Sequence, residues 1–259
     1  MDDRLFATFL RELCGNSSFG KKLYDLIGSW EKAKGLANST QSDPVVKLRH
    51  EVGYLRFSGH RKIFHQKYII GDPGRGVEFH ESSLYRYCGL VSSYSSQEEF
   101  YKRPFGPVYS ELKQVPGGDR TFAFDLIESV YRYVVPHPSL RPSGLCIEGS
   151  TGPLLGFNLL YFGAREFGKQ DWTRKINDAW GTSNDVWKTV ESQGKRLVAR
   201  AEEQARQKNE STEFVVFELE DAVCNYQKAH KFGGSPDLFL NGEISIEDFA
   251  KVYLSAFGR

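Results

Sequence analysis

Apolar side chains recur every three to four residues along most of the chain, which is the spacing of helices that bury one face. In residues 2–13, two aspartates precede apolar residues that share one helical face, and acidic residues favour the start of a helix. The same spacing predicts helices over 21–34, 81–92, 97–102, 121–134, 153–167, 184–208, 214–231 and 246–256. The sequence therefore predicts a mainly α fold of about eight helices.

The predicted helix over 121–134 illustrates how this pattern assigns core positions. Phe122, Leu126, Val130 and Tyr133 recur at helical spacing and form one apolar stripe. A stripe of this kind normally faces the protein core. We therefore expect all four side chains to lie on the buried face of this helix.

Between residues 53 and 70 the pattern changes to alternation of polar and apolar positions, which is typical of half-buried strands. The runs 54–58 and 63–67 alternate in this way, and the segment Ser58-Gly59-His60 between them is typical of a turn. We therefore expect a small β-hairpin or sheet near residues 53–70.

Two segments rich in proline and glycine interrupt the helical pattern. RPFGP at 103–107 carries two prolines, which should break any helix and hold the chain extended. VPGGD at 115–119 predicts a joint between an N-terminal half, residues 1–116, and a C-terminal helical half, residues 117–259. The two halves share a weak match in the spacing of Glu-Phe, Cys and Phe residues. This match either marks two similar halves or arises by chance in an aromatic-rich chain.

The composition places the chain among globular proteins without a strong electrostatic partner. Lys plus Arg is 34 and Asp plus Glu is 33, so the formal net charge is +1 and no overall field attracts nucleic acid or a membrane surface. No apolar run approaches the length of roughly 20 residues that a membrane-spanning helix needs. The N-terminus lacks the pattern of a signal peptide. We therefore expect no membrane span and an intracellular location.

The four cysteines are widely separated in the sequence and form no Cys-x-x-Cys pair. This spacing fits neither a disulfide framework nor a zinc site. We expect reduced thiols, no disulfide among the four, and a reducing compartment such as the cytoplasm.

The sequence contains segments that resemble phosphate-binding and calcium-binding loops, but each lacks residues that the motif requires. GDPGRG at 71–76 lacks the Lys-Ser/Thr ending of a phosphate-binding loop, and CIEGSTGP at 146–153 marks the start of a helix. The segment 237–248 imitates a calcium loop, but Phe239 occupies a ligand position. The histidines show no metal-ligand spacing. The sequence therefore favours a binding protein with no metal site, and an enzyme without a sequence signature is the other interpretation.

The segment 47–68 combines basic and aromatic residues, with a local charge of +5. Its six cations are Lys47, Arg49, Arg56, Arg61, Lys62 and Lys67. Stacking on bases and neutralisation of phosphates need these two residue types on one surface. The segment therefore fits a single-stranded nucleic-acid binder, such as a viral nucleoprotein or a defence protein. It also fits a hairpin with a basic outer face and an aromatic inner face.

Aromatic residues make up 14% of the chain, which exceeds what one helical core of this size normally uses. Exposed aromatic side chains are typical of interfaces between proteins. The segment 100–109 gathers four of them around its two prolines. These candidate interaction residues are Phe100, Tyr101, Phe105 and Tyr109. We therefore expect an exposed aromatic patch here that binds a partner protein or a second copy of the chain.

Three segments resemble the phycobilisome linker family and its pigment-bearing relatives, the phycoerythrin gamma subunits. NGEISIEDFAKVYLSAFGR at 241–259 is similar to a helix of rod linkers, and IESVYRYVV at 127–135 is similar to a short helix of the same domain. FHESSLYRYCGLVSSYSSQEEFYKRP at 79–104 resembles a gamma-subunit segment. Members of this family are usually strongly basic, whereas this chain is nearly neutral.

The resemblance implies a non-enzymatic scaffold or linker that lies inside a larger assembly in the plastid stroma. It also implies bilins, which are linear tetrapyrroles, held by cysteine thioethers. The candidate attachment residues are Cys14, Cys88, Cys146 and Cys224. Binding of single-stranded nucleic acid by the segment 47–68 is the alternative function.

Overall fold

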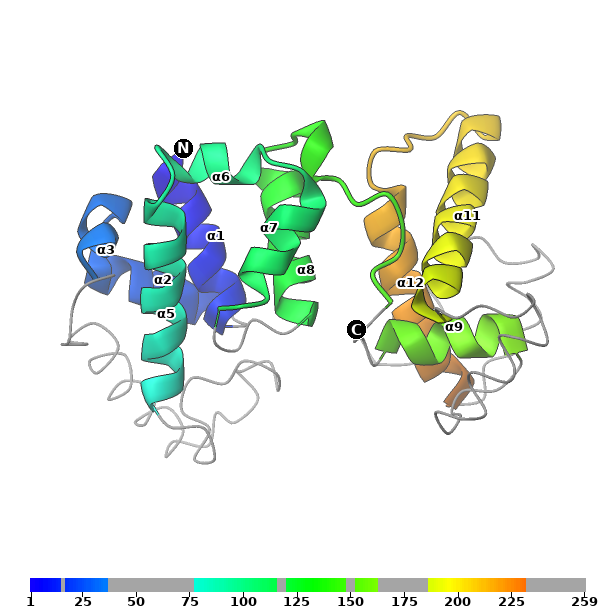
Figure 1. Ribbon diagram of the computed structural model, residues 1–259, viewed down its shortest axis with the longest axis horizontal. Helices are drawn as coiled ribbons and strands as arrows, with labels where there is room; N and C mark the ends of the chain where they lie inside the picture. Colours follow the sequence, from blue (N-terminus) through cyan, green and yellow to red (C-terminus); the bar gives the residue numbers. More distant parts are fainter. Residues whose placement is uncertain (15–16, 37–76, 116–119, 148–151, 163–185, 232–259) are drawn as a thin grey trace. The chain divides into compact units, whose positions relative to one another are not determined.

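The computed structural model describes most of the chain as a set of helices (Figure 1). The described residues are 1–14, 17–36, 77–115, 120–147, 152–162 and 186–231. They contain α-helices and one short 3-10 helix but no strand. The mainly α fold is confirmed. The expected hairpin near 53–70 and the expected helix over 246–256 lie outside the described residues.

The chain divides into two compact units, Met1–Arg141 and Pro142–Arg259. This division differs from the predicted joint at 115–119, because helix α8 (Arg120–Tyr133) packs on α1 (Asp2–Cys14) and α7 (Phe105–Leu112) of the first unit. The predicted boundary between 1–116 and 117–259 is therefore wrong. Its turn residues connect two helices of one unit rather than two domains.

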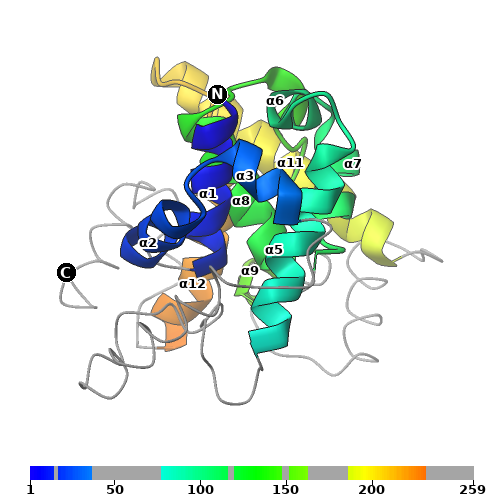
Figure 2. The ribbon, with the colours of Figure 1, turned by 90° about the vertical axis from the view of Figure 1, so that its left-hand side faces the viewer.

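The N-terminal unit is organised around α1, whose apolar face supplies five side chains to the core (Figure 1 and Figure 2). Helix α1 packs against α2, α3, α6 and α8. The other elements of this unit are α2 (Ser17–Ile27), α3 (Trp30–Leu36), α5 (Val77–Ser92), α6 (Gln97–Tyr101) and the 3-10 helix η2 (Pro138–Leu140). The helix predicted over 2–13 is thus the centre of the unit.

Large aromatic side chains fill the space around α1. The ring of Phe9 stacks on the ring of Tyr87 with centroids 3.6 Å apart and planes 4° apart. Phe9 also meets the edge of Phe122, and Phe6 packs against Trp30 at 5.5 Å. These contacts join α1 to α5, α8 and α3, so part of the aromatic content of the sequence is used inside this core.

The single helix predicted over 21–34 is two helices, α2 and α3, separated at Gly28. Gly28 has a φ of 95°, in the left-handed region that favours glycine. The backbone N–H of Trp30 then donates to Oδ1 of Asp3 at 2.7 Å, so a side chain of α1 caps the start of α3. The hydroxyl of Ser29 also accepts from the backbone N–H of Lys32 at 3.3 Å, so a local cap accompanies the distant one.

The prolines of 103–107 do not hold the chain extended. Pro104 ends the connection after α6, and α7 begins at Phe105 and includes Pro107 in its first turn. Proline is tolerated there because the N–H groups of the first turn have no partner within the helix. The predicted break does separate α6 from α7, but a further helix starts inside the segment.

The described residues of the C-terminal unit form α9 (Gly152–Phe162), α11 (Val186–Gln207) and α12 (Val215–Lys231). Helix α9 lies closely against α12, and α11 packs on α12 as well. The crossing of α9 and α12 depends on Gly156, since a Cβ atom added there would lie 1.8 Å from the carbonyl oxygen of Val223. The two backbones thus approach so closely that only glycine fits.

Candidate functional site

The aromatic segment predicted to be exposed is partly buried. Phe100 and Tyr101 have no exposed surface, because α6 lays both side chains into the core of the N-terminal unit. The ring of Phe105 stacks on that of Tyr109 at 5.1 Å, and both residues are half-buried. The prediction of an exposed patch is therefore wrong for Phe100 and Tyr101. Phe105 and Tyr109 remain partly accessible.

A buried polar network explains the burial of Tyr101. The hydroxyl of Tyr87 donates to Oε1 of Gln97 at 2.9 Å and lies 3.1 Å from the hydroxyl of Tyr101. The Gln97 side chain also donates to the backbone oxygen of Asp2 at 2.6 Å. Burial raises the pKa of Tyr101 and raises that of Tyr87 well above its ordinary value. The network therefore holds neutral phenols and ties α6 to the start of α1, which is a structural role.

The described cysteines differ in accessibility. Cys88 lies on α5 with no exposed surface, and burial raises the pKa of its thiol to about 12. In the folded unit this sulfur is closed to solvent, and the attachment of a bilin at Cys88 stays a prediction. Cys146 and Cys224 are half-buried, and the side chain of Cys14 lies outside the description. No disulfide joins Cys88, Cys146 and Cys224 to one another.

The six cations predicted to bind nucleic acid lie outside the described residues. Among the residues that are described, no group of three or more metal-ligating side chains occurs. In the same part of the chain, no helix is long and apolar enough to cross a membrane.

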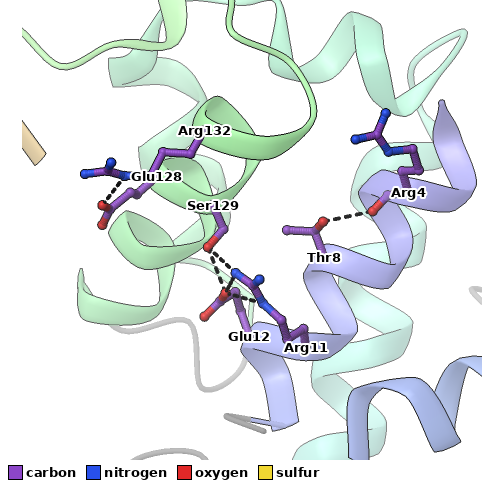
Figure 3. Close-up of polar contacts among 7 residues, drawn as sticks. All are labelled: Arg4, Thr8, Arg11, Glu12, Glu128, Ser129 and Arg132. Atoms are coloured by element: carbon purple, nitrogen blue, oxygen red, sulfur yellow. Dashed lines mark hydrogen bonds and ion pairs between the residues drawn. The ribbon is translucent and has the colours of Figure 1, made fainter. Parts of the chain in front are cut away.

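A polar cluster joins α1 to α8 (Figure 3). Both Nε and Nη2 of Arg11 donate to Oε1 of Glu12, at 3.0 and 2.5 Å. The hydroxyl of Ser129 on α8 donates to the same Glu12 oxygen at 2.8 Å and accepts from Arg11 Nη2 at 2.6 Å. Figure 3 shows the three side chains pointing toward one another from the two helices. Because each holds the other two, the Arg11 guanidinium has a fixed position.

Tyr133 lies beside this cluster with 61% of its surface exposed. The guanidinium of Arg11 lies 5.7 Å from the centroid of the Tyr133 ring. The exposed side chain of Arg4 donates to the backbone oxygen of Tyr133 at 2.7 Å. We name this region the Tyr133 surface; it consists of Arg4, Arg11, Glu12, Ser129 and Tyr133.

Sequence reasoning missed the Tyr133 surface, because it placed Tyr133 on the buried stripe of its helix. Phe122, Leu126 and Val130 do lie in the core, as predicted. At the C-terminal end of α8, Val134 and Val135 are buried instead, and Tyr133 points outward. The residues that mark this surface are Arg4 and Arg11 of α1. Their nearness to Tyr133 follows only from the packing of α1 against α8.

Comparison of the chain with models of protein families, with curated proteins and with solved structures found no match.

Proposed function

We propose that the chain is a non-enzymatic scaffold protein that assembles with a second copy of itself through the Tyr133 surface. The observation that carries this proposal is the exposure of Tyr133 on a rigid pair of helices. Among the described residues, Met1 is the other large hydrophobic side chain exposed to a similar degree. Tyrosine and arginine are the residues that most often dominate the binding energy of interfaces between proteins.

Preorganisation supports this role. Arg11 is held by Glu12 and Ser129, and Arg4 is held by the backbone at the end of α8. Binding therefore immobilises few additional rotamers, which lowers the entropic cost of association. The arginines also lie where a second aromatic ring can stack on their guanidinium groups.

The charges favour a second copy as the partner. A two-fold contact brings the same surface of each copy together, so the surface must complement itself. The Tyr133 surface carries the cations Arg4 and Arg11 and the carboxylate Glu12, while Glu128 and Arg132 form a 2.7 Å ion pair on α8. Glu12 already pairs with Arg11 and Glu128 with Arg132, so these charges are neutralised within each copy and oppose a two-fold contact little. The net charge of +1 produces little repulsion between copies.

The test is sedimentation velocity of the full chain over a concentration series. The wild type should self-associate, and Tyr133→Ala should weaken the association by about 30-fold or more, the effect of a typical hot-spot residue. Tyr133→Phe keeps the ring and should associate normally. Lys21→Ala is a matched surface control, since it removes the exposed Lys21–Asp25 pair of α2 in the same unit. A wild type that stays monomeric at about 1 mM, where an association free energy of about −4 kcal/mol would show, contradicts the proposal.

The pigment-bearing form of this proposal places bilins on the accessible cysteines. Cys146 and Cys224 are the half-buried thiols of the C-terminal unit. Such a scaffold would work in a reducing compartment, the plastid stroma for a linker of the phycobilisome type. The protein purified from its source and then denatured should absorb visible light if a bilin is covalently attached. Cys146→Ser and Cys224→Ser identify the attachment site.

Single-stranded nucleic-acid binding is the second proposed function, and the local charge of +5 over 47–68 favours it. Neutralisation of phosphates by several cations makes binding weaken steeply with salt. Fluorescence anisotropy with a labelled oligonucleotide at several salt concentrations tests this. Changing Arg56, Arg61 and Lys67 to Glu should abolish binding and leave self-association unchanged. Oligonucleotide binding that is unaffected by these changes contradicts a role for the segment.

A further inference from the structure

The loop between α5 and α6 reads SSYSS over residues 92–96 and leads directly into two glutamates of α6. Ser95 in this loop is exposed. Glu98 follows it by three positions and Glu99 by four, and both carboxylates are at least partly exposed. Kinases select their substrates by the pattern of charges around the serine. An exposed loop serine followed by acidic residues matches a serine kinase that reads negative charge after the acceptor.

Ser95 already contacts one of these glutamates. Its backbone N–H donates to Oε2 of Glu99 at 2.9 Å, and its hydroxyl donates to the same oxygen. In the other direction, the backbone N–H of Glu99 donates to the hydroxyl of Ser96 at 3.0 Å. These reciprocal bonds are those of a capping box, which fixes the first turn of a helix. The start of α6 therefore depends on a carboxylate that lies against the Ser95 hydroxyl.

Helix α6 has only five residues, so its cap and its contacts with α1 hold it in place. The backbone N–H of Gln97 donates to Oδ1 of Asp2 at 3.1 Å. Phe100 and Tyr101 are fully buried in the N-terminal unit. The position of α6 thus decides whether these two aromatic side chains are covered, and the Asp2 carboxylate adds a second negative group at its start.

The cations that follow α6 already have carboxylate partners. Nζ of Lys102 lies 2.6 Å from Oε1 of Glu98, and Nη2 of Arg103 lies 2.6 Å from Oε1 of Glu111. A phosphate next to free arginines orders a segment, whereas a phosphate next to acidic side chains disrupts it by repulsion. The contacts of Ser95 correspond to the second case, because its hydroxyl touches Glu99.

We propose that Ser95 is a phosphorylation site and that its phosphate releases α6 from α1. In the reaction, the Ser95 oxygen attacks the γ-phosphorus of ATP, the bond from that phosphorus to ADP breaks, and the hydroxyl proton passes to the base of the kinase. The product carries nearly two negative charges at pH 7 and has lost the proton that it donated to Glu99. Repulsion then opens the capping box. The proposal does not depend on self-association through the Tyr133 surface.

The first test is the position of the phosphate. The full chain is treated with Mg²⁺, ATP and an acid-directed serine kinase of the casein-kinase type, and peptides are analysed by mass spectrometry. Phosphate should appear on Ser95 and be absent from Ser95→Ala. Glu98→Gln removes the acid three positions later and should slow the reaction several-fold. Ser93→Ala is the matched control, because Ser93 is exposed in the same loop but is followed at that distance by Ser96; it should react as the wild type does.

The second test is hydrogen exchange of the phosphorylated and unmodified chains. Exchange over residues 97–102 should be faster by about tenfold or more after phosphorylation, since a hydrogen bond to a charged group contributes about that much. Exchange in α11 of the other unit should be unchanged. Glu99→Gln removes the repelling charge, so phosphorylation of this variant should accelerate exchange over 97–102 much less. Ser95→Ala treated with the kinase should exchange as the untreated variant does.

Four outcomes would overturn the proposal. One is a wild type that takes up no phosphate at Ser95, and another is uptake on Ser96 in its place. Exchange over 97–102 that is unchanged or slower after phosphorylation would mean that the phosphate is tolerated at the start of α6 or strengthens its cap. Equal acceleration in Glu99→Gln and in the wild type would mean that the phosphate does not act through this carboxylate.

Discussion

The two units of this protein bury their helices in different ways. In the N-terminal unit, α1 is amphipathic and meets its neighbours through stacked rings such as Phe9 on Tyr87. In the C-terminal unit, α9 is apolar around most of its surface and meets α12 through the backbone at Gly156. The described core of the first unit thus gathers large aromatic side chains, whereas α9 and α12 of the second unit meet where a side chain is absent. Helix α2 also approaches α1 closely at Gly20, where an added Cβ would lie 2.7 Å from Cα of Arg11. Truncation of a buried ring in the first unit and addition of a methyl group at Gly156 in the second should therefore each destabilise one unit and leave the other unchanged.

The largest effect is expected from Phe9→Ala. Phe9 is fully buried and its ring contacts Phe6, Tyr87 and Phe122, so truncation removes the transfer energy of the ring and leaves a cavity. The free energy of unfolding of the N-terminal unit should fall by about 3–5 kcal/mol. Hydrogen exchange measured by mass spectrometry reports each unit separately. Faster exchange should appear in α1, α5 and α8, with α9 and α12 unchanged.

Equal acceleration in α9 and α12 would contradict the picture of two separate cores. Phe9→Leu is a useful second variant, because it keeps most of the buried volume and should cost less than Phe9→Ala. If Phe9→Leu proves as costly as Phe9→Ala, the stacked geometry of the ring matters more than its volume.

The second-largest effect is expected from Gly156→Ala. A methyl group there would lie 1.8 Å from the Val223 oxygen, which is backbone and cannot move aside without separating α9 from α12. We expect the free energy of unfolding of the C-terminal unit to fall by about 3 kcal/mol. Hydrogen exchange should accelerate in α9 and α12 and remain unchanged in α1.

Gly35→Ala is the matched control, because an added Cβ at Gly35 on α3 meets nothing within 4 Å. It should be neutral or stabilise the N-terminal unit by up to about 1 kcal/mol, since alanine restricts the unfolded chain. A neutral Gly156→Ala would show that α9 and α12 do not cross as closely as described.

The sequence predicted where helices lie far better than what they pack against. The helix predicted over 2–13 is α1 at Asp2–Cys14, and that predicted over 214–231 is α12 at Val215–Lys231. Periodicity is a local property, so it locates such helices well. The break at Gly28 was missed because the apolar spacing continues across it, although Gly28 and the capping residue Ser29 are local signals.

The candidate sites were harder to predict for the same reason. Phe100 and Tyr101 were expected on the surface because prolines follow them, yet both side chains are buried in the core of the N-terminal unit. Tyr133 was expected in the core because its spacing fits the stripe, yet the chain leaves the helix at that point. Pairs such as Arg4 with Tyr133 arise only from packing between helices. Whether a side chain is exposed therefore depends on contacts between helices, which the apolar spacing within a single helix does not predict.

The smallest effect is expected from Glu111→Gln, which should change the stability of the N-terminal unit toward acid. In the N-terminal unit, Arg103 donates to both oxygens of Glu111, at 2.6 and 3.0 Å, and also contacts the hydroxyl of Tyr94. These hydrogen bonds from Arg103 lower the pKa of Glu111 below its ordinary value of 4.5. Since the folded-state pKa is the lower one, the carboxylate stabilises the fold above about pH 4.5. This contribution is lost as the pH falls through the folded-state pKa.

Glu111→Gln should therefore lower the free energy of unfolding at pH 7 by less than about 1 kcal/mol, as expected for a pair that is a quarter exposed. The difference between variant and wild type should shrink to zero below the folded-state pKa of Glu111. The pKa values of Glu98 and Glu99 are also lowered, by Lys102 and Ser95 respectively, and the subtraction removes their contributions. Urea unfolding between pH 2 and 7 measures this difference, with hydrogen exchange to assign it to α7. A constant difference across that range would mean that Glu111 acts through packing rather than through its charge.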